Sequence, residues 1–150
     1  LDYMKNMFSN VYAIENRGSC KNTWVVFDKD EFDIEKAIKL ARENQVHVAW
    51  SNECFELWIL LHFRLVEIAI GRKECLIKVK EFLKKEMKLD YTKNNKDIYG
   101  KLKSKLRIAI ANAKRQHQLI KRDGVLPNRA NPCTTVYELV EHLVQRIDEE

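Results

Sequence analysis

The order strand, helix, strand near the start of the chain limits the fold more than any other feature of the sequence. Trp24–Asp28 is a short β-branched and aromatic run after a polar stretch, which predicts a buried strand entered from a loop. Asp33 can cap a helix whose apolar stripe begins at Ile34, and residues 46–50 predict the next strand. Such a βαβ unit implies two parallel strands joined by a right-handed crossover.

A two-stranded parallel sheet needs further partners, because parallel strands are normally covered on both faces and flanked by other strands. Residues 11–14 (VYAI) are one candidate for a third strand. The alternative is that sheet partners are missing from the N-terminus, since the sequence starts at Leu1 and we expect it to be a fragment or a processed chain.

From residue 53 onward the sequence pattern is helical. Apolar residues recur at helical spacing over residues 53–70, 73–89 and about 98–121, and again from near Thr134 or Thr135. Residues 122–133 hold both prolines and predict a defined loop. We therefore expect an α/β fold in a single domain, with a βαβ part in residues 1–52 and a helical part in residues 53–150.

The longest apolar run, residues 54–70, is interrupted by Glu56, His62, Arg64 and Glu67, which would make a membrane-spanning helix costly. We expect a core helix there and no membrane association. The sequence also shows no charged leader with a cleavage site, so we expect the cytoplasm. Its four cysteines are widely spaced without a CxxC pair, which predicts reduced and mostly buried thiols.

Asp28 and Asp30 form an Asp-x-Asp pair at the carboxyl end of the first predicted strand, where open α/β sheets bind ligands. Two such carboxylates repel each other unless a cation lies between them, and their hard oxygens suit Mg²⁺ or Mn²⁺. The alternative is that Asp28 only ends the strand and Asp30 is a turn or cap residue. On the pair alone, the second interpretation is the commoner case.

Residues 51–63 (SNECFELWILLHF) follow the second predicted strand. Ser51 or Asn52 can cap the helix expected there, and Glu56 lies one turn further along among apolar residues. A buried carboxylate needs a partner, so Glu56 is either a metal ligand or catalytic base, or one half of a structural ion pair or hydrogen-bond network. His62 lies on the apolar side and fits a core histidine better than a ligand.

Charge is distributed unevenly along the chain. Residues 72–129 carry 18 Lys and Arg against 6 Asp and Glu, a net charge of +12 within a chain of net charge +5. A basic helical face of this kind can bind nucleic acid, and a solvated lysine-rich surface is the alternative. The candidate nucleic-acid-binding residues are Lys101, Lys105, Lys114, Arg115, Lys121 and Arg122.

A last polar cluster contains Asn131, Thr134 and Thr135. Its hydroxyls and the amides of the following helix could contact phosphate, although helix capping alone explains the two threonines.

Several spaced blocks together resemble the RloB-like protein family. They are WVVFDKDEF at residues 24–32, SNECFELWILLHF at 51–63, ANAK at 111–114 and NPCTTVYELVEHL at 131–143. Glu53 stands where the family commonly has proline. The resemblance covers the chain from Trp24 onward, while the first strand and the Gly- and Glu-bearing turn of the family have no counterpart in this sequence.

The resemblance implies a partial Toprim-like sheet in which Asp28 and Asp30 hold Mg²⁺ or Mn²⁺. It also implies a metal-dependent nuclease of bacterial anti-phage defence, linked to restriction loci and abortive infection, with DNA or RNA as target and with a partner ATPase encoded nearby. We expect Glu56 to complete or orient the site. Without the first acidic motif, the fragment alone is expected to be inactive.

The sequence is also consistent with two other functions. The basic face can serve a non-catalytic nucleic-acid-binding module, or the helical half can be a regulatory surface for the partner ATPase. The oligomeric state is also left open by the sequence.

Overall fold

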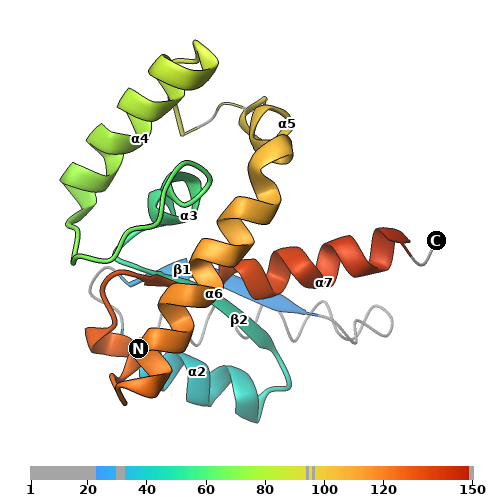
Figure 1. The fold of residues 1–150 in the computed structure, drawn as a ribbon. Helices are drawn as coiled ribbons and strands as arrows, with labels where there is room; N and C mark the ends of the chain where they lie inside the picture. Colours follow the sequence, from blue (N-terminus) through green and yellow to red (C-terminus); the bar gives the residue numbers. More distant parts are fainter. Residues whose placement is uncertain (1–22, 30–32, 94, 96, 149–150) are drawn as a thin grey trace.

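A computed structural model describes residues 23–29, 33–93, 95 and 97–148 of the chain. Within these residues a three-stranded sheet runs in the order β1 (Trp24–Asp28), β2 (His47–Asn52) and β3 (Cys133–Thr134). Helices pack around this sheet and make up most of the second half of the chain (Figure 1). The predicted α/β fold with a helical C-terminal half is therefore confirmed.

The strands β1 and β2 are parallel, as the βαβ pattern predicts. Trp24 pairs with His47 and Asp28 pairs with Ser51, so both strands end at the same edge of the sheet. The amide of Lys29 donates to the carbonyl of Ser51 at 2.9 Å, which continues the pairing one residue beyond Asp28.

The crossover between these strands is α2 (Ile34–Glu43), which buries Ile34, Ala37 and Ala41. The helix begins where predicted, because the Asp33 side chain accepts a hydrogen bond from the amide of Lys36 at 3.1 Å. A residue far along the chain also helps, since the amide of Ile34 donates to Oδ1 of Asn128 at 2.7 Å.

A third strand comes from a part of the chain where none was predicted. β3 lies in the C-terminal half, where the stretch predicted to be a loop meets the start of the last predicted helix, and residues 11–14 lie outside the described residues. β3 pairs antiparallel with β2, with Ser51 opposite Thr134 and Asn52 opposite Cys133. A two-residue strand has no periodicity that could be recognised in the sequence, because only its tertiary pairing defines it.

The single helix predicted over residues 53–70 is wrong. The helix is α3 (Glu56–Leu60), one of only five residues, and residues 64–71 contain no helix. Ser51 and Asn52 belong to β2 and do not cap it; Phe55 is the N-cap residue and makes no side-chain capping bond. The end of this helix could not be located in the sequence, because Leu57, Leu60 and Leu61 are fully buried and the segment has no amphipathic pattern.

The remaining helices follow the predicted order with one interruption. The helix predicted at residues 73–89 is α4 (Arg72–Met87), and the last helix is α7 (Val136–Asp148). The long basic helix is broken into α5 (Ile98–Leu102), the 3-10 turn η1 (Lys103–Lys105) and α6 (Leu106–Arg122). A second 3-10 turn, η2 (Pro127–Arg129), lies in the loop before β3.

The largest core cluster joins α3, α4, α6 and α7 to Ala49 of β2. In Figure 1, α4 and α6 stand on either side of α3, while α7 extends away from the other helices toward the C-terminus. Cys54, Cys75 and Cys133 are buried free thiols, as predicted, and Cys20 lies outside the described residues. None of the helices described is long and apolar enough to cross a membrane.

Candidate functional site

The carboxyl edge of β1 and β2 brings together side chains that are far apart in the sequence. Asp28 ends β1 and Asn52 ends β2, and the parallel register places these two ends side by side. The side chain of Asp28 is about 25% exposed, so it is accessible from this edge. Asn52 is buried, with 2% of its surface exposed. Asp30 lies outside the described residues.

Arg72, the first residue of α4, reaches the same edge. Its Nη1 lies 3.5 Å from Oδ2 of Asp28, and its Nη2 donates to the carbonyl of Glu53 at 3.1 Å. Its backbone amide donates to Oε2 of Glu53, also at 3.1 Å. Glu53 thus caps α4 from outside the helix, since the N-cap residue Gly71 makes no side-chain bond. At this edge the guanidinium of Arg72 therefore contacts the carboxylate of Asp28 and the backbone carbonyl of Glu53, while the Glu53 carboxylate accepts from the backbone amide of Arg72.

Asn131 holds the segment that leads into Arg72. Its Oδ1 accepts from the amide of Ile70 and its Nδ2 donates to the carbonyl of Ile70, both at 3.1 Å. Because Cys133 pairs with Asn52, Asn131 lies just beyond the carboxyl end of β2. It therefore serves to position the start of α4 at this edge.

Thr134 and Thr135 fasten β3 to β2. The hydroxyls of Thr134 and Ser51 are 2.8 Å apart and buried, and Thr134 Oγ1 also accepts from the amide of Val136 at 3.3 Å. Thr135 Oγ1 accepts from the amide of Trp50 at 3.0 Å. Thr134 thus accepts from the first amide of α7, whereas the hydroxyl of Thr135 serves the amide of Trp50 in β2.

Glu56 is buried and engaged away from Arg72. The hydroxyl of Tyr91 donates to its Oε1 at 3.0 Å, and Nζ of Lys93 lies 3.8 Å from the same oxygen. Burial alone would raise the pKa of Glu56, but hydrogen bonds from its own amide, Tyr91 and Cys54, together with Lys93, outweigh burial and lower it. These contacts are those of the hydrogen-bond network proposed as the alternative to a catalytic role.

His62 lies in the core, with 3% of its surface exposed. Its Nδ1 is 2.9 Å from the carbonyl of Trp58, and its ring meets the Trp58 ring edge to face. Burial lowers the pKa of His62, so the ring is neutral at physiological pH. Such a histidine supports the packing of α3.

The basic residues named from the sequence are mostly engaged in ion pairs on the surface. Four of the six pair within the chain: Lys105 with Glu86, Lys114 with Glu141, Arg115 with Glu67 and Arg122 with Asp123. Exposed pairs of this kind are weak and can open, so they reduce the free positive charge of this surface without removing it. Lys101 and Lys121 are exposed.

Comparison with known proteins settles the family. The profile described as RloB-like protein matches residues 2–143. The chain belongs to the RloB-like protein family. No curated protein and no solved structure matches it. The family match also begins at residue 2, well before Trp24, where the resemblance in the sequence analysis began.

The described part of the RloB-like chain offers only part of a magnesium site. Asp28 fits as one ligand, because its carboxylate is a hard oxygen donor at an accessible strand end. No group of three His, Cys, Asp or Glu side chains that could hold a metal occurs among the described residues. Arg72 places one positive charge beside Asp28, with its Nη1 3.5 Å from the carboxylate.

No motif in this RloB-like chain marks Arg72 and Glu53 as site residues. Arg72 stands 44 positions from Asp28, and only the fold brings the two together. The available signal was Gly71 before the predicted α4, since a helix that starts without a side-chain cap needs a partner from elsewhere.

Proposed function

We propose that the carboxyl edge of β1 and β2 is the phosphodiester-hydrolysing site of a Toprim-like nuclease. The observation that carries this proposal is the parallel register that ends both strands at one edge, with the carboxylate of Asp28 accessible there. Ligands of open α/β sheets bind outside such strand ends. Family membership supports the further proposal that the nuclease acts in anti-phage defence by abortive infection.

Asp28 and Asp30 are the proposed ligands of Mg²⁺ or Mn²⁺. When bound, the ion would polarise the scissile phosphate and lower the pKa of a water molecule. The protein's own contribution is to hold Asp28 in place. Arg72 contacts Asp28 from α4, and Arg72 is itself fixed by two hydrogen bonds to Glu53.

Nucleic acid, DNA or RNA, is the proposed substrate. The basic stretch of residues 72–129 carries the charge that would attract a polyanion. Lys101, Arg115, Lys121 and Arg122 of the proposed set are exposed, and those in ion pairs would exchange a carboxylate for a phosphate on binding. Control by a partner ATPase encoded nearby is part of the same proposal.

A catalytic role for Glu56 remains a prediction. A general base works best with a pKa near the working pH, whereas hydrogen bonds and Lys93 hold the pKa of Glu56 below its usual value. Its contacts with Tyr91 and Lys93 support a structural role instead.

Metal titration tests the proposal. Calorimetric titration with Mg²⁺ and Mn²⁺ is expected to give binding to the full-length protein that weakens in Asp28→Asn and in Asp30→Asn. Cleavage of nucleic acid is expected to fall with it. Asp90→Asn is the matched control, because Asp90 is an exposed acid paired with Lys84 on the other end of α4.

Three outcomes would contradict the nuclease proposal. Unchanged metal affinity and unchanged cleavage in both variants would remove the assignment of Asp28 and Asp30. Salt-sensitive nucleic-acid binding without any metal requirement or cleavage would favour the non-catalytic binding module. Binding of the partner ATPase that is insensitive to metal and lost on charge reversal of the basic helix would favour a regulatory module.

A further inference from the structure

The end of α7 presents an apolar stripe to solvent. Val140, Leu143, Val144 and Ile147 recur at intervals of three and four residues or one apart, which places them on one face of the helix. Leu143 is 50% exposed and Ile147 is 70% exposed. An apolar stripe of this kind normally faces other apolar groups, because its exposure to water is unfavourable. The end of α7 therefore has the pattern of a helix that packs against a further element.

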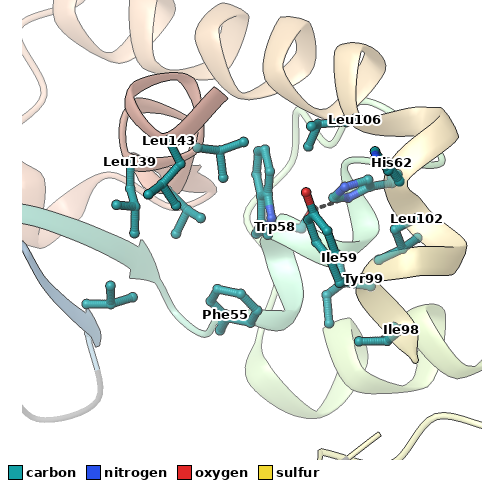
Figure 2. A pocket seen from close by; sticks show the side chains of 14 residues that line it. Phe55, Trp58, Ile59, His62, Ile98, Tyr99, Leu102, Leu106, Leu139 and Leu143 are labelled. Atoms are coloured by element: carbon teal, nitrogen blue, oxygen red, sulfur yellow. Dashed lines mark hydrogen bonds between the residues drawn. The ribbon is translucent and has the colours of Figure 1, made fainter. Parts of the chain in front are cut away.

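A pocket of about 290 Å³ opens beside this stripe, between α3, α5, α6 and α7. Figure 2 shows its lining, with Phe55 and Trp58 from the α3 region, Leu102 and Leu106 from α5 and α6, and Leu143 from α7. The lining is mostly apolar, and the histidine ring in its wall already bonds a main-chain carbonyl. The pocket is therefore suited to an apolar side chain.

The pocket continues into a groove of about 480 Å³ between α6 and α7, because Tyr99, Lys103 and Leu106 line both. Val144 and Ile147 of the α7 stripe also line the groove. We call the pocket and the groove together the α7 face. A contiguous group of exposed apolar side chains of this kind marks an interaction surface. The exposed apolar residues that line it include Phe55, Tyr99, Leu143, Val144 and Ile147.

The charge of the α7 face is mainly positive. Lys103 and Arg107 line the groove and are exposed, and neither forms an ion pair with a residue that the structure describes. Glu141 also lines the groove, but its carboxylate lies 2.6 Å from Nζ of Lys114 and is neutralised there. The last turn of α7 adds Arg146. The α7 face therefore combines apolar groups with an excess of positive charge.

We propose that the α7 face is a docking site for an acidic amphipathic helix of a different protein. Such a helix, laid along the groove, places one apolar side chain in the pocket and others against Val144 and Ile147. Acidic side chains on its flank meet Lys103 and Arg107, so the charges of the two surfaces are complementary. This inference does not depend on the proposed nuclease activity.

A helix fits the α7 face better than two other occupants. A small apolar ligand that fills the pocket leaves Val144 and Ile147 of the stripe in water. A second copy of this chain, packed by a two-fold axis, sets the same described cations, Lys103 and Arg107, on both sides of the contact. A partner with acidic side chains has neither disadvantage.

Fluorescence anisotropy with two labelled peptides tests the proposal. Both peptides are designed amphipathic helices of about 18 residues with leucines on one face, and the flanks carry glutamate in one and lysine in the other. The glutamate peptide is expected to bind the full chain with a Kd in the micromolar range, more tightly than the lysine peptide. Ile147→Gln is expected to weaken this binding about tenfold. The matched control is Ile77→Gln, because Ile77 is 56% exposed on α4 and lies outside both depressions.

Reversal of the two cations separates charge recognition from apolar contact alone. In the double variant Lys103→Glu, Arg107→Glu, the preference is expected to reverse, so that the lysine peptide binds more tightly than the glutamate peptide. The matched control is Lys80→Glu, Lys85→Glu, which changes the net charge equally at exposed positions of α4 outside both depressions. This control is expected to keep the preference for glutamate. Far-UV circular dichroism and thermal melting establish that each variant is folded.

Three results overturn the proposal. The first is a glutamate peptide that does not bind the unaltered chain at about 100 μM, well above the micromolar range of specific contacts. The second is binding that Ile147→Gln leaves unchanged, or an equal loss of preference in both double variants. The third is a dimer in sedimentation equilibrium that Ile147→Gln abolishes, because it assigns the α7 face to a second copy of this chain.

Discussion

The guanidinium of Arg72 lies 3.5 Å from the carboxylate of Asp28, although 44 residues separate them in the chain. This contact ties the start of α4 to the end of β1. Asn131 supports it from a third part of the sequence by holding Ile70 at both its amide and its carbonyl. The candidate site is thus built by three segments that meet only in the folded chain.

Replacement of Arg72 should separate these segments. We expect Arg72→Gln to lower the free energy of unfolding by roughly 1 kcal/mol, because the ion pair with Asp28 is partly exposed and the hydrogen bond to the carbonyl of Glu53 is lost as well. Urea unfolding measures this change. Lys73→Gln, at the next and exposed position, should change stability by only a few tenths of that amount.

Asn131 should matter more than its neighbours because both of its side-chain groups are used. Asn131→Ala leaves the amide and carbonyl of Ile70 without these partners, and we expect a loss of about 1–3 kcal/mol in unfolding free energy. Asn131→Asp keeps the acceptor for the amide of Ile70 but sets a carboxylate oxygen against the carbonyl of Ile70, so it should also be destabilising. Equal stability of Asn131→Ala and the unaltered protein would contradict the role of this residue.

The hydroxyls of Ser51 and Thr134 should behave as a coupled pair. Thr134→Val leaves the buried hydroxyl of Ser51 without its partner, at a cost of about 1–3 kcal/mol. Adding Ser51→Ala to Thr134→Val should then cost less than the sum of the two single changes. Chemical denaturation of the four proteins completes a double-mutant cycle, and strict additivity would show that the pair is not coupled.

Glu56 and Tyr91 provide a second cycle. We expect Glu56→Gln and Tyr91→Phe each to reduce the unfolding free energy by roughly 1–2 kcal/mol at neutral pH, because each removes one side of a part-buried hydrogen bond to an ionised group. The pKa of Glu56 is lowered in the folded chain, so its favourable contribution is present above its usual pKa and is lost as pH falls through the lower folded value. Retention of full metal-dependent cleavage in Glu56→Gln would exclude a catalytic base there.

His117 should make the free energy of unfolding depend on pH in a higher pH range than Glu56 does. Burial lowers its pKa to about 4, with Lys121 adding to the effect, although the carboxylate of Glu138 lies 3.6 Å from its Nδ1. The unfolded chain, with a histidine pKa near 6.5, binds more protons than the folded chain between those two values. Stability should therefore fall as pH is lowered from about 6.5 to 4.

The measurement for His117 is an NMR titration of its ring beside urea unfolding at several pH values. The pH dependence of unfolding should be shallower in His117→Gln, and the part that remains is expected from His62, whose pKa burial also lowers. A ring that titrates at or above pH 6.5 would show that Glu138 outweighs burial.

The sequence by itself determined the βαβ unit, the capped start of α2 at Asp33 and the helical second half of the chain. These features depend on short-range patterns of apolar residues, caps and breakers, which are written locally in the sequence. The parallel register that places Asp28 at the carboxyl edge follows from the same pattern, since a helix-length connection between two strands makes them parallel.

Only the tertiary structure decided what surrounds Asp28. The strand β3, the short α3 and the approach of Arg72 depend on pairing partners tens of residues away, and a two-residue strand or a helix buried on all sides has no period of its own. The tertiary structure also decided the partners of Glu56. A buried carboxylate must find hydrogen-bond donors, but which donors it finds depends on where the fold brings Tyr91 and Lys93.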